Sequence, residues 1–158
     1  MIKIVAVGKL KEKALRMQIE EYEKRLRPFT KLEIIEVPDE NAPQSNSEAE
    51  NEIVKDKEGE RLLSKIKDGE YVILLDLWGE MIDSIAFAKK LESIQIYQSP
   101  NITFVIAGSL GPSKDVVKRA DYRWKLSDLT FTHQMTRVLV LEQIYRGYMI
   151  QHHNPYHK

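Results

Sequence analysis

The stretch that decides the fold runs from Leu126 to Arg146 and reads LSDLTFTHQMTRVLVLEQIYR. Its first part, Ser127 to His133, is a polar loop with three hydroxyl side chains, an aspartate and a histidine. Its second part predicts a helix over residues 134–150, in which apolar side chains spread beyond a single stripe. We therefore expect this last helix to be covered on more than one side, by the rest of its domain or by a second copy of the chain.

Three ionisable residues lie within this apolar helix: Arg137, Glu142 and Arg146. Buried charges need partners, because an unpaired charge in a protein interior is destabilised. Glu142 and Arg146 stand four positions apart, which is the spacing of an ion pair on one helical face. The simplest interpretation pairs these two residues and leaves Arg137 in water, and the alternative gives the charged residues a functional role.

The composition is that of an ordinary soluble protein of 158 residues, with a net charge of zero and no cysteine. The length predicts one domain, residues 1–158, and the lack of cysteine excludes disulfides and a thiol nucleophile. No run of ~18 apolar residues and no N-terminal leader is present, so a cytoplasmic protein is expected. Residues 36–60 hold nine acidic and two basic side chains. A surface that faces RNA, if the protein has one, would therefore be built from the two more basic ends of the chain.

Strand and helix patterns alternate along the whole chain. Apolar runs predict strands at residues 2–7, 32–37, 71–76, 102–107 and 122–126. Helices are predicted at residues 13–27, 47–67, 84–97, 113–120 and 134–150, and residues 38–47 form a loop. This alternation predicts an α/β domain with a mostly parallel sheet and helices on both faces. The almost wholly apolar strand 71–76 should be central in that sheet.

Three loops follow predicted strands at the carboxyl edge of the sheet, where ligands of open α/β sheets bind. They are Leu75–Gly79, Ala107–Gly111 and Ser127–His133. Gly108 and Gly111 suit both a strand-to-helix turn and the close approach of a ligand to bare backbone. The residues alone therefore predict one site shared by these three loops.

Three common site types do not fit the sequence. A dinucleotide-binding turn needs three spaced glycines after the first strand, and Gly8 stands alone there. A hydrolase elbow needs Gly-x-Ser-x-Gly, which residues 108–111 do not form. The four histidines lie in the last part of the chain without the spacing of a metal site. We expect no bound metal.

The residues quoted at the outset resemble a known family. The motif LSDLTFTHQM-x-RV, the following LEQIYR and the ending NPYHK resemble the SPOUT methyltransferases. Within them, they are similar to the small single-domain branch that methylates N3 of a pseudouridine in bacterial 23S ribosomal RNA (position 1915, in helix 69). Further matches lie at residues 5–9, 35–38 and 57–59, so the resemblance covers essentially the whole chain.

The resemblance implies a C-terminal trefoil knot, a homodimer and S-adenosylmethionine bound in the knot. Matched position by position, it implies a cofactor site formed by Leu75, Ala107, Gly108, Gly111, Ser127, Asp128, Leu129, Thr130, Phe131 and Thr132. Two positions depart from the family pattern, which often has Gly-Gly at residues 107–108 and Pro-His at residues 132–133. A backbone contact tolerates Ala107 if its φ is negative.

The reaction that the resemblance implies moves a methyl group from a sulfonium to a ring nitrogen that must lose its proton. We expect His157 to act as a base or as a cation beside the developing charge, with His133 as the second candidate. Arg137 would hold a phosphate or a uracil oxygen, and Tyr156 would stack on the flipped base. In the family the tail reaches over the partner subunit's cofactor. The active site would then be composite.

The substrate that the resemblance implies is 23S ribosomal RNA. Because the protein has no net positive charge, we expect it to recognise the assembled ribosome rather than free RNA. The alternative from another class is a non-catalytic ribosome-associated RNA-binding module with the same fold. A family member acting on transfer RNA would usually carry an extra RNA-binding domain, for which this chain has no room.

Overall fold

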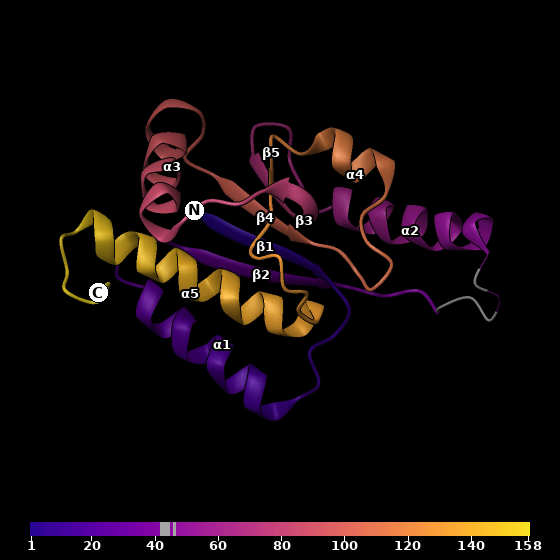
Figure 1. Cartoon of the computed structure of the whole chain (residues 1–158), viewed down its shortest axis with the longest axis horizontal. Coiled ribbons are helices and arrows are strands. Elements are labelled where there is room, and N and C mark those ends of the chain that lie inside the picture. Colours follow the sequence, from indigo (N-terminus) through magenta and orange to yellow (C-terminus); the bar gives the residue numbers. More distant parts are fainter. Residues whose placement is uncertain (42–44, 46) are drawn as a thin grey trace.

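A computed structural model describes residues 1–41, 45 and 47–158, and it contains a single five-stranded sheet with five helices among those residues (Figure 1). All strand pairs are parallel, and the strand order is β2-β1-β4-β3-β5. The elements in chain order are β1 (Ile2–Val7), α1 (Lys13–Leu26), β2 (Leu32–Val37), α2 (Glu48–Leu63), β3 (Tyr71–Glu80), α3 (Ser84–Tyr97), β4 (Ile102–Ile106), α4 (Lys114–Arg119), β5 (Tyr122–Trp124) and α5 (His133–Gln151).

Helices cover both faces of the sheet, as the alternating pattern predicted. Along β1, alternate side chains point to opposite faces: Ile2 and Ile4 pack against α1, α3 and α5, while Val5 and Val7 join the core under α2 and α4. In Figure 1, α1 and α5 lie side by side on one face, and α2 and α4 lie on the other. The α/β class and the parallel sheet are therefore confirmed, and β3 is an interior strand between β4 and β5.

The last helix, α5, packs between α1 and α3 against the sheet. Its inner residues Val140, Leu141 and Ile144 have no exposed surface. Met135, on the outward side, keeps 40% of its surface exposed, and Leu139 is only partly buried. The rest of the domain therefore covers the inner side of α5, as expected. An apolar strip, formed by Met135 and Leu139, remains on the outer side near the amino end of the helix.

Two element ends differ from those predicted by more than two residues. Strand β3 continues to Glu80 because it resumes pairing there: the backbone of Lys125 donates to the Glu80 carbonyl at 3.0 Å. Helix α2 ends at Leu63 rather than near residue 67. Its predicted start is confirmed, since the Ser47 side chain caps it by accepting from the Glu50 N–H at 3.2 Å. The loop predicted for residues 38–47 includes residues 42–44 and 46, which lie outside the described residues.

The acidic residues of α2 would by composition form a solvated face, and Glu58 departs from this. That side chain is buried (6% exposed), and one of its oxygens accepts from the backbone N–H of Glu40 at 3.1 Å. The neighbouring Gly59, which weakens the helix by propensity, has a packing role. A Cβ atom at Gly59 would lie 2.3 Å from the Ser113 hydroxyl oxygen, so only glycine lets α2 and α4 approach this closely.

Candidate active site

The carboxyl edge of the sheet holds a cavity of about 780 Å³. After β3 the chain turns to the face of α3, and after β4 it turns to the opposite face, so a crevice opens between the two strands. Residues of all three predicted loops line it, together with the start of α5. The three loops that the sequence placed at one edge are therefore brought together.

Nine of the ten residues predicted to surround a cofactor line this cavity: Leu75, Ala107, Gly108, Gly111, Ser127, Leu129, Thr130, Phe131 and Thr132. The tenth, Asp128, points away from it. The Asp128 carboxylate pairs with the Lys125 ammonium at 2.7 Å, and the aspartate side chain is 77% exposed. Its structural role is to tie the loop to the end of β5.

The backbone of the β4–α4 loop lies open to the cavity. Gly111 has a φ of +91°, which only glycine adopts without strain. A Cβ atom at Gly108 would lie 2.8 Å from an oxygen of the buried Glu58 carboxylate, so a side chain at this position would have to displace that carboxylate. Ala107 is not among the described residues with positive φ, so its methyl group replaces the family's glycine without strain.

The cavity has the size and lining of a site for a nucleoside-sized organic cofactor. Ligand pockets of about 300–1,000 Å³ are typical, with mainly apolar walls and a few polar groups. Leu110, Leu129 and Phe131 supply apolar surface here, while Ser127 and Thr130 supply hydroxyls. Loop backbone N–H and C=O groups beside them can read the edge of an adenine ring. These residues therefore fit S-adenosylmethionine.

Short local hydrogen bonds shape the loop before α5. The Ser127 hydroxyl accepts from the Leu129 N–H at 3.0 Å, and the Thr132 hydroxyl caps α5 by accepting from the Met135 N–H at 3.2 Å. Thr132 has a φ of −61°, close to the value that a proline ring imposes. The threonine thus reproduces the backbone of the family's proline and adds a cap.

His133 is the first residue of α5 and lines the cavity. Burial lowers the pKa of His133 below its usual value, the positive charge of Arg137 lowers it further, and Asp39 opposes both effects. The imidazole is therefore neutral near pH 7 and able to accept a proton.

Arg137 lies one helical turn further along α5, and its side chain is buried (2% exposed). One guanidinium nitrogen pairs with Glu36 at 2.7 Å. Another donates to the carbonyls of Val7 and Gly8 at 2.8 and 2.7 Å. The interpretation that left Arg137 in water is therefore wrong. In this chain Arg137 fastens the start of α5 to the carboxyl ends of β1 and β2.

The other two residues predicted to act in catalysis lie far from this cavity. Tyr156 and His157 fold back on the carboxyl half of α5, where they contact Glu142 and Arg146. The predicted pairing of Glu142 with Arg146 is confirmed. Arg146 lies thirteen positions after His133 on α5, which corresponds to about 20 Å along the helix at 1.5 Å per residue. Figure 1 shows the C-terminus at the opposite end of α5 from the loop that precedes it. One chain alone does not bring its tail to its own cavity.

Sequence reasoning missed several residues at the cavity. Trp78 is 85% exposed on its rim. The buried Asp76 carboxylate orients this loop, because it accepts from the Trp78 N–H at 3.0 Å and from Arg123 at 2.6 Å. Their signal was present in the sequence: Trp78 belongs to one of the three loops, and an aromatic residue after an apolar strand is a candidate for binding.

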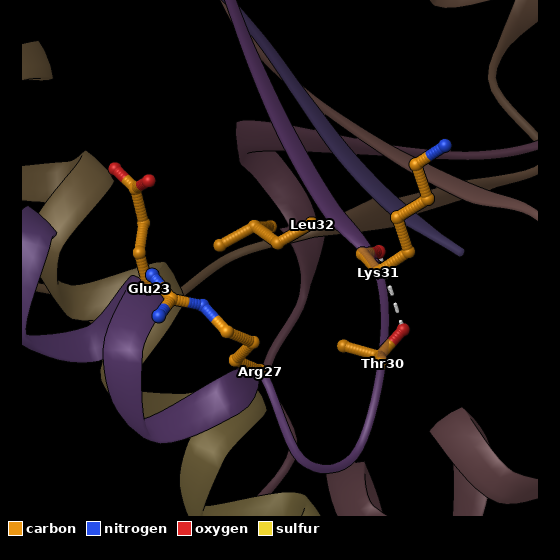
Figure 2. Close-up of a pocket in the computed structure, with 5 residues that line it drawn as sticks. All are labelled: Glu23, Arg27, Thr30, Lys31 and Leu32. Carbon is orange, nitrogen blue, oxygen red and sulfur yellow. Dashed lines mark hydrogen bonds between the residues drawn. The ribbon is translucent and has the colours of Figure 1, made fainter.

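A second, smaller depression of about 410 Å³ lies at the amino end of β2, away from the carboxyl edge (Figure 2). Its walls are the end of α1 and the turn into the strand, with Thr30, Lys31 and Leu32 on the strand side. It contains none of the predicted site residues. Among the described residues, no group of histidines and carboxylates could hold a metal ion, and no helix is long and apolar enough to cross a membrane.

Comparison with known proteins agrees with the site. A protein named ribosomal RNA large subunit methyltransferase H, from Alkaliphilus oremlandii, is 55% identical over 157 residues, which cover 99% of both chains. Proteins with this name from Ligilactobacillus salivarius and Clostridium perfringens are 54% and 52% identical with the same coverage. The profile of a family described as "Predicted SPOUT methyltransferase" matches residues 1–157. This chain therefore belongs to the SPOUT methyltransferase family.

Proposed function

We propose that this protein is a methyltransferase of the large ribosomal subunit that uses S-adenosylmethionine to methylate N3 of a pseudouridine in helix 69 of 23S ribosomal RNA. The observation that carries the proposal is the cavity at the carboxyl edge, with its open glycine backbone and apolar walls, in a chain whose full-length relatives are named as methyltransferases of that RNA. The whole chain acts as one domain, in the cytoplasm, where ribosomes are found.

The cofactor supplies a methyl group on a sulfonium, which is a good leaving group. The residues of this chain then have two tasks: to hold the donor in line with the acceptor and to handle the proton of N3. The loops at residues 107–111 and 127–132 would hold the donor. His133, neutral and at the cavity, is placed to accept a proton. Arg137 would position these groups by fixing the first turn of α5, because both of its terminal guanidinium nitrogens donate to protein acceptors.

We propose a homodimer in which the tail of one protomer completes the cavity of the other. The apolar strip of Met135 and Leu139 lies near the cavity end of α5, and the tail lies near its other end. Two α5 helices that pack antiparallel about a two-fold axis would cover both strips and bring each tail to the partner's cavity. Tyr156 would then stack on the flipped base. Family membership further supports a trefoil knot at the C-terminus.

We propose the assembled ribosome as the substrate. The chain has no net charge, so its attraction to a bare phosphate backbone is weak. Recognition of a target nucleotide then depends on the shape of a folded particle that fits both subunits of the dimer. Free 23S RNA lacks that shape and should be a poor substrate.

The test is transfer of a tritiated methyl group from S-adenosylmethionine to ribosomes from cells that lack this protein, followed by mapping of the labelled nucleotide. We expect label on one pseudouridine of 23S RNA in ribosomes and little in protein-free RNA. His157→Ala should bind cofactor normally by calorimetry and transfer the methyl group at least about a hundredfold more slowly.

Each other outcome points to a different function. Cofactor binding without label would keep a methyltransferase and discard this substrate. Equal labelling of ribosomes and free RNA would contradict recognition of the assembled particle. Ribosome binding with neither label nor cofactor affinity would leave the non-catalytic binding module.

A further inference from the structure

A network of polar contacts joins the tail to the carboxyl half of α5. Arg146 Nε donates to a Glu142 carboxylate oxygen at 3.0 Å, and Arg146 Nη1 lies 3.1 Å from Nδ1 of His157. The same guanidinium lies over the Tyr156 ring, 4.7 Å from its centroid. The Tyr156 hydroxyl donates to Glu142 at 3.3 Å. One ion pair on α5 therefore holds both tail residues that the proposed function places at the substrate.

The contact between Arg146 and His157 has only one chemically consistent form. A guanidinium carries five N–H donors and no acceptor, and it stays protonated in proteins. Nδ1 of His157 must therefore be the acceptor and must carry a lone pair. A neutral imidazole with a bare Nδ1 has its proton on Nε2. A doubly protonated ring would turn an N–H toward a cation, which removes the hydrogen bond and adds charge repulsion.

We propose that Arg146 is a positioning residue that holds His157 as the neutral Nε2–H tautomer, so that His157 donates a hydrogen bond to the substrate base and does not remove its proton. The inference rests on the proposed function, because the substrate lies in the partner's cavity. It makes His157 a neutral hydrogen-bond donor in place of the base or cation expected from the sequence.

The donor role fits the charge that develops in the reaction. N3 of the base forms the bond to the methyl carbon, the carbon–sulfur bond breaks with its electron pair kept by sulfur, and the N3 proton leaves. An imide that loses this proton spreads negative charge over its two carbonyl oxygens. The Nε2–H group of His157 can stabilise one of these oxygens. The proton goes to another acceptor, for which neutral His133 at the cavity is placed.

The network is built to keep Arg146 in one orientation. Its planar fork meets Glu142 through two nitrogens and leaves Nη1 for His157. Tyr22 and Tyr145 pack close by, with the Arg25 guanidinium 5.6 Å from each of their ring centroids. Tyr145 also meets the Tyr156 ring edge-on, with 4.9 Å between centroids. The tail thus meets a pre-organised surface of its own helix.

The tautomer can be measured directly by ¹⁵N–¹H NMR of the histidine rings in the full-length protein. His157→Gln assigns the signal, because it removes one of four ring systems. We expect wild-type His157 to be the neutral Nε2–H form at neutral pH, and Arg146→Met to convert it to a mixture of tautomers. Arg16→Met removes an exposed guanidinium on α1 and should change nothing. A wild-type His157 that is protonated on Nδ1 would overturn the proposal.

The donor role is tested by comparing three substitutions of His157 in single-turnover methyl transfer. Glutamine places an amide N–H near the position of Nε2, asparagine places one near Nδ1, and alanine has neither. Neither amide can act as a base. We expect alanine and asparagine to lose about 10²- to 10³-fold in rate and glutamine to lose far less, with cofactor binding unchanged in all three. A glutamine variant as slow as the alanine variant would overturn the donor role.

These measurements separate the inference from the proposed function. Absence of methyl transfer by the wild-type protein would overturn the proposed function and the donor role together. The NMR measurement would still decide whether Arg146 selects the tautomer, because it needs no substrate.

Discussion

At the scale of single residues, the local backbone conformation accommodates Ala107 and Thr132, the two departures from the family pattern. Thr132 takes a φ of −61° and caps α5, so it fills the place of a proline in backbone terms. Gly108 leaves room for the buried Glu58 carboxylate beneath it and does not have a positive φ. The burial of Glu58 also raises the pKa of its carboxyl group, with the nearby carboxylates of Asp39 and Glu40 adding to that effect.

Substitutions of Thr132 test the backbone explanation. Thr132→Pro should leave stability within about 1 kcal/mol of wild type, because the ring matches the observed φ while the cap is lost. Thr132→Ala loses the cap without the proline constraint and should destabilise the protein by about 1 kcal/mol. Urea unfolding followed by circular dichroism measures both. A proline variant much less stable than the alanine variant would contradict this account of the loop.

The sequence did not predict the burial of charged residues whose hydrogen-bond partners lie far away in the chain. Nothing near Arg137 in the sequence indicates that Glu36, a hundred positions earlier, would neutralise it, or that the carbonyls of Val7 and Gly8 would accept from it. The same holds for Glu58, which is buried although the acidic residues on either side of it, Asp56 and Glu60, are exposed. The local pair of Glu142 and Arg146 was predictable because its partners are four residues apart on one helix.

At the scale of elements, the positions of strands and helices followed from hydrophobic period, and their ends depended on pairing and packing. Strand β3 runs past residue 76 because it pairs again with the end of β5. The close contact of α2 with α4 at Gly59 could not be inferred from helix propensity, because propensity describes glycine only as destabilising a helix. The three loops of the site were predictable as a group, since parallel strands place their carboxyl ends at one edge.

The two glycines 59 and 69 allow a matched test of that helix contact. Gly59→Ala raises helix propensity by about 1 kcal/mol, yet its methyl group would meet the Ser113 side chain. We expect a net loss of about 1–3 kcal/mol in unfolding free energy, as for other overpacked sites. Gly69→Ala meets no atom within 4 Å and should be near neutral. A Gly59→Ala protein more stable than wild type would contradict this prediction, because α2 and α4 could then move apart without loss of unfolding free energy.

At the scale of the whole molecule, the two groups of residues that the proposed function assigns to one site lie at opposite ends of α5. The cavity and His133 are at its amino end, and Tyr156 and His157 are at its carboxyl end, roughly 20 Å away along the helix. The proposed two-fold pairing of antiparallel α5 helices would resolve this separation. Sequence periodicity indicated only that α5 was too apolar for a surface helix; the resemblance supplied the dimer.

The central claim is that each active site combines the cavity of one protomer with the tail of its partner, and mixed dimers test it most directly. One variant carries Gly111→Val in the cavity loop, the other His157→Ala in the tail, and each homodimer should be inactive in methyl transfer to ribosomes. When the two are co-expressed in equal amounts, half of the dimers are mixed and each has one intact composite site. Since half of the dimers keep one of their two sites, about a quarter of wild-type activity is expected. Activity no higher than that of the separate variants would contradict it, because a tail that serves its own chain leaves every site in the mixed dimer defective.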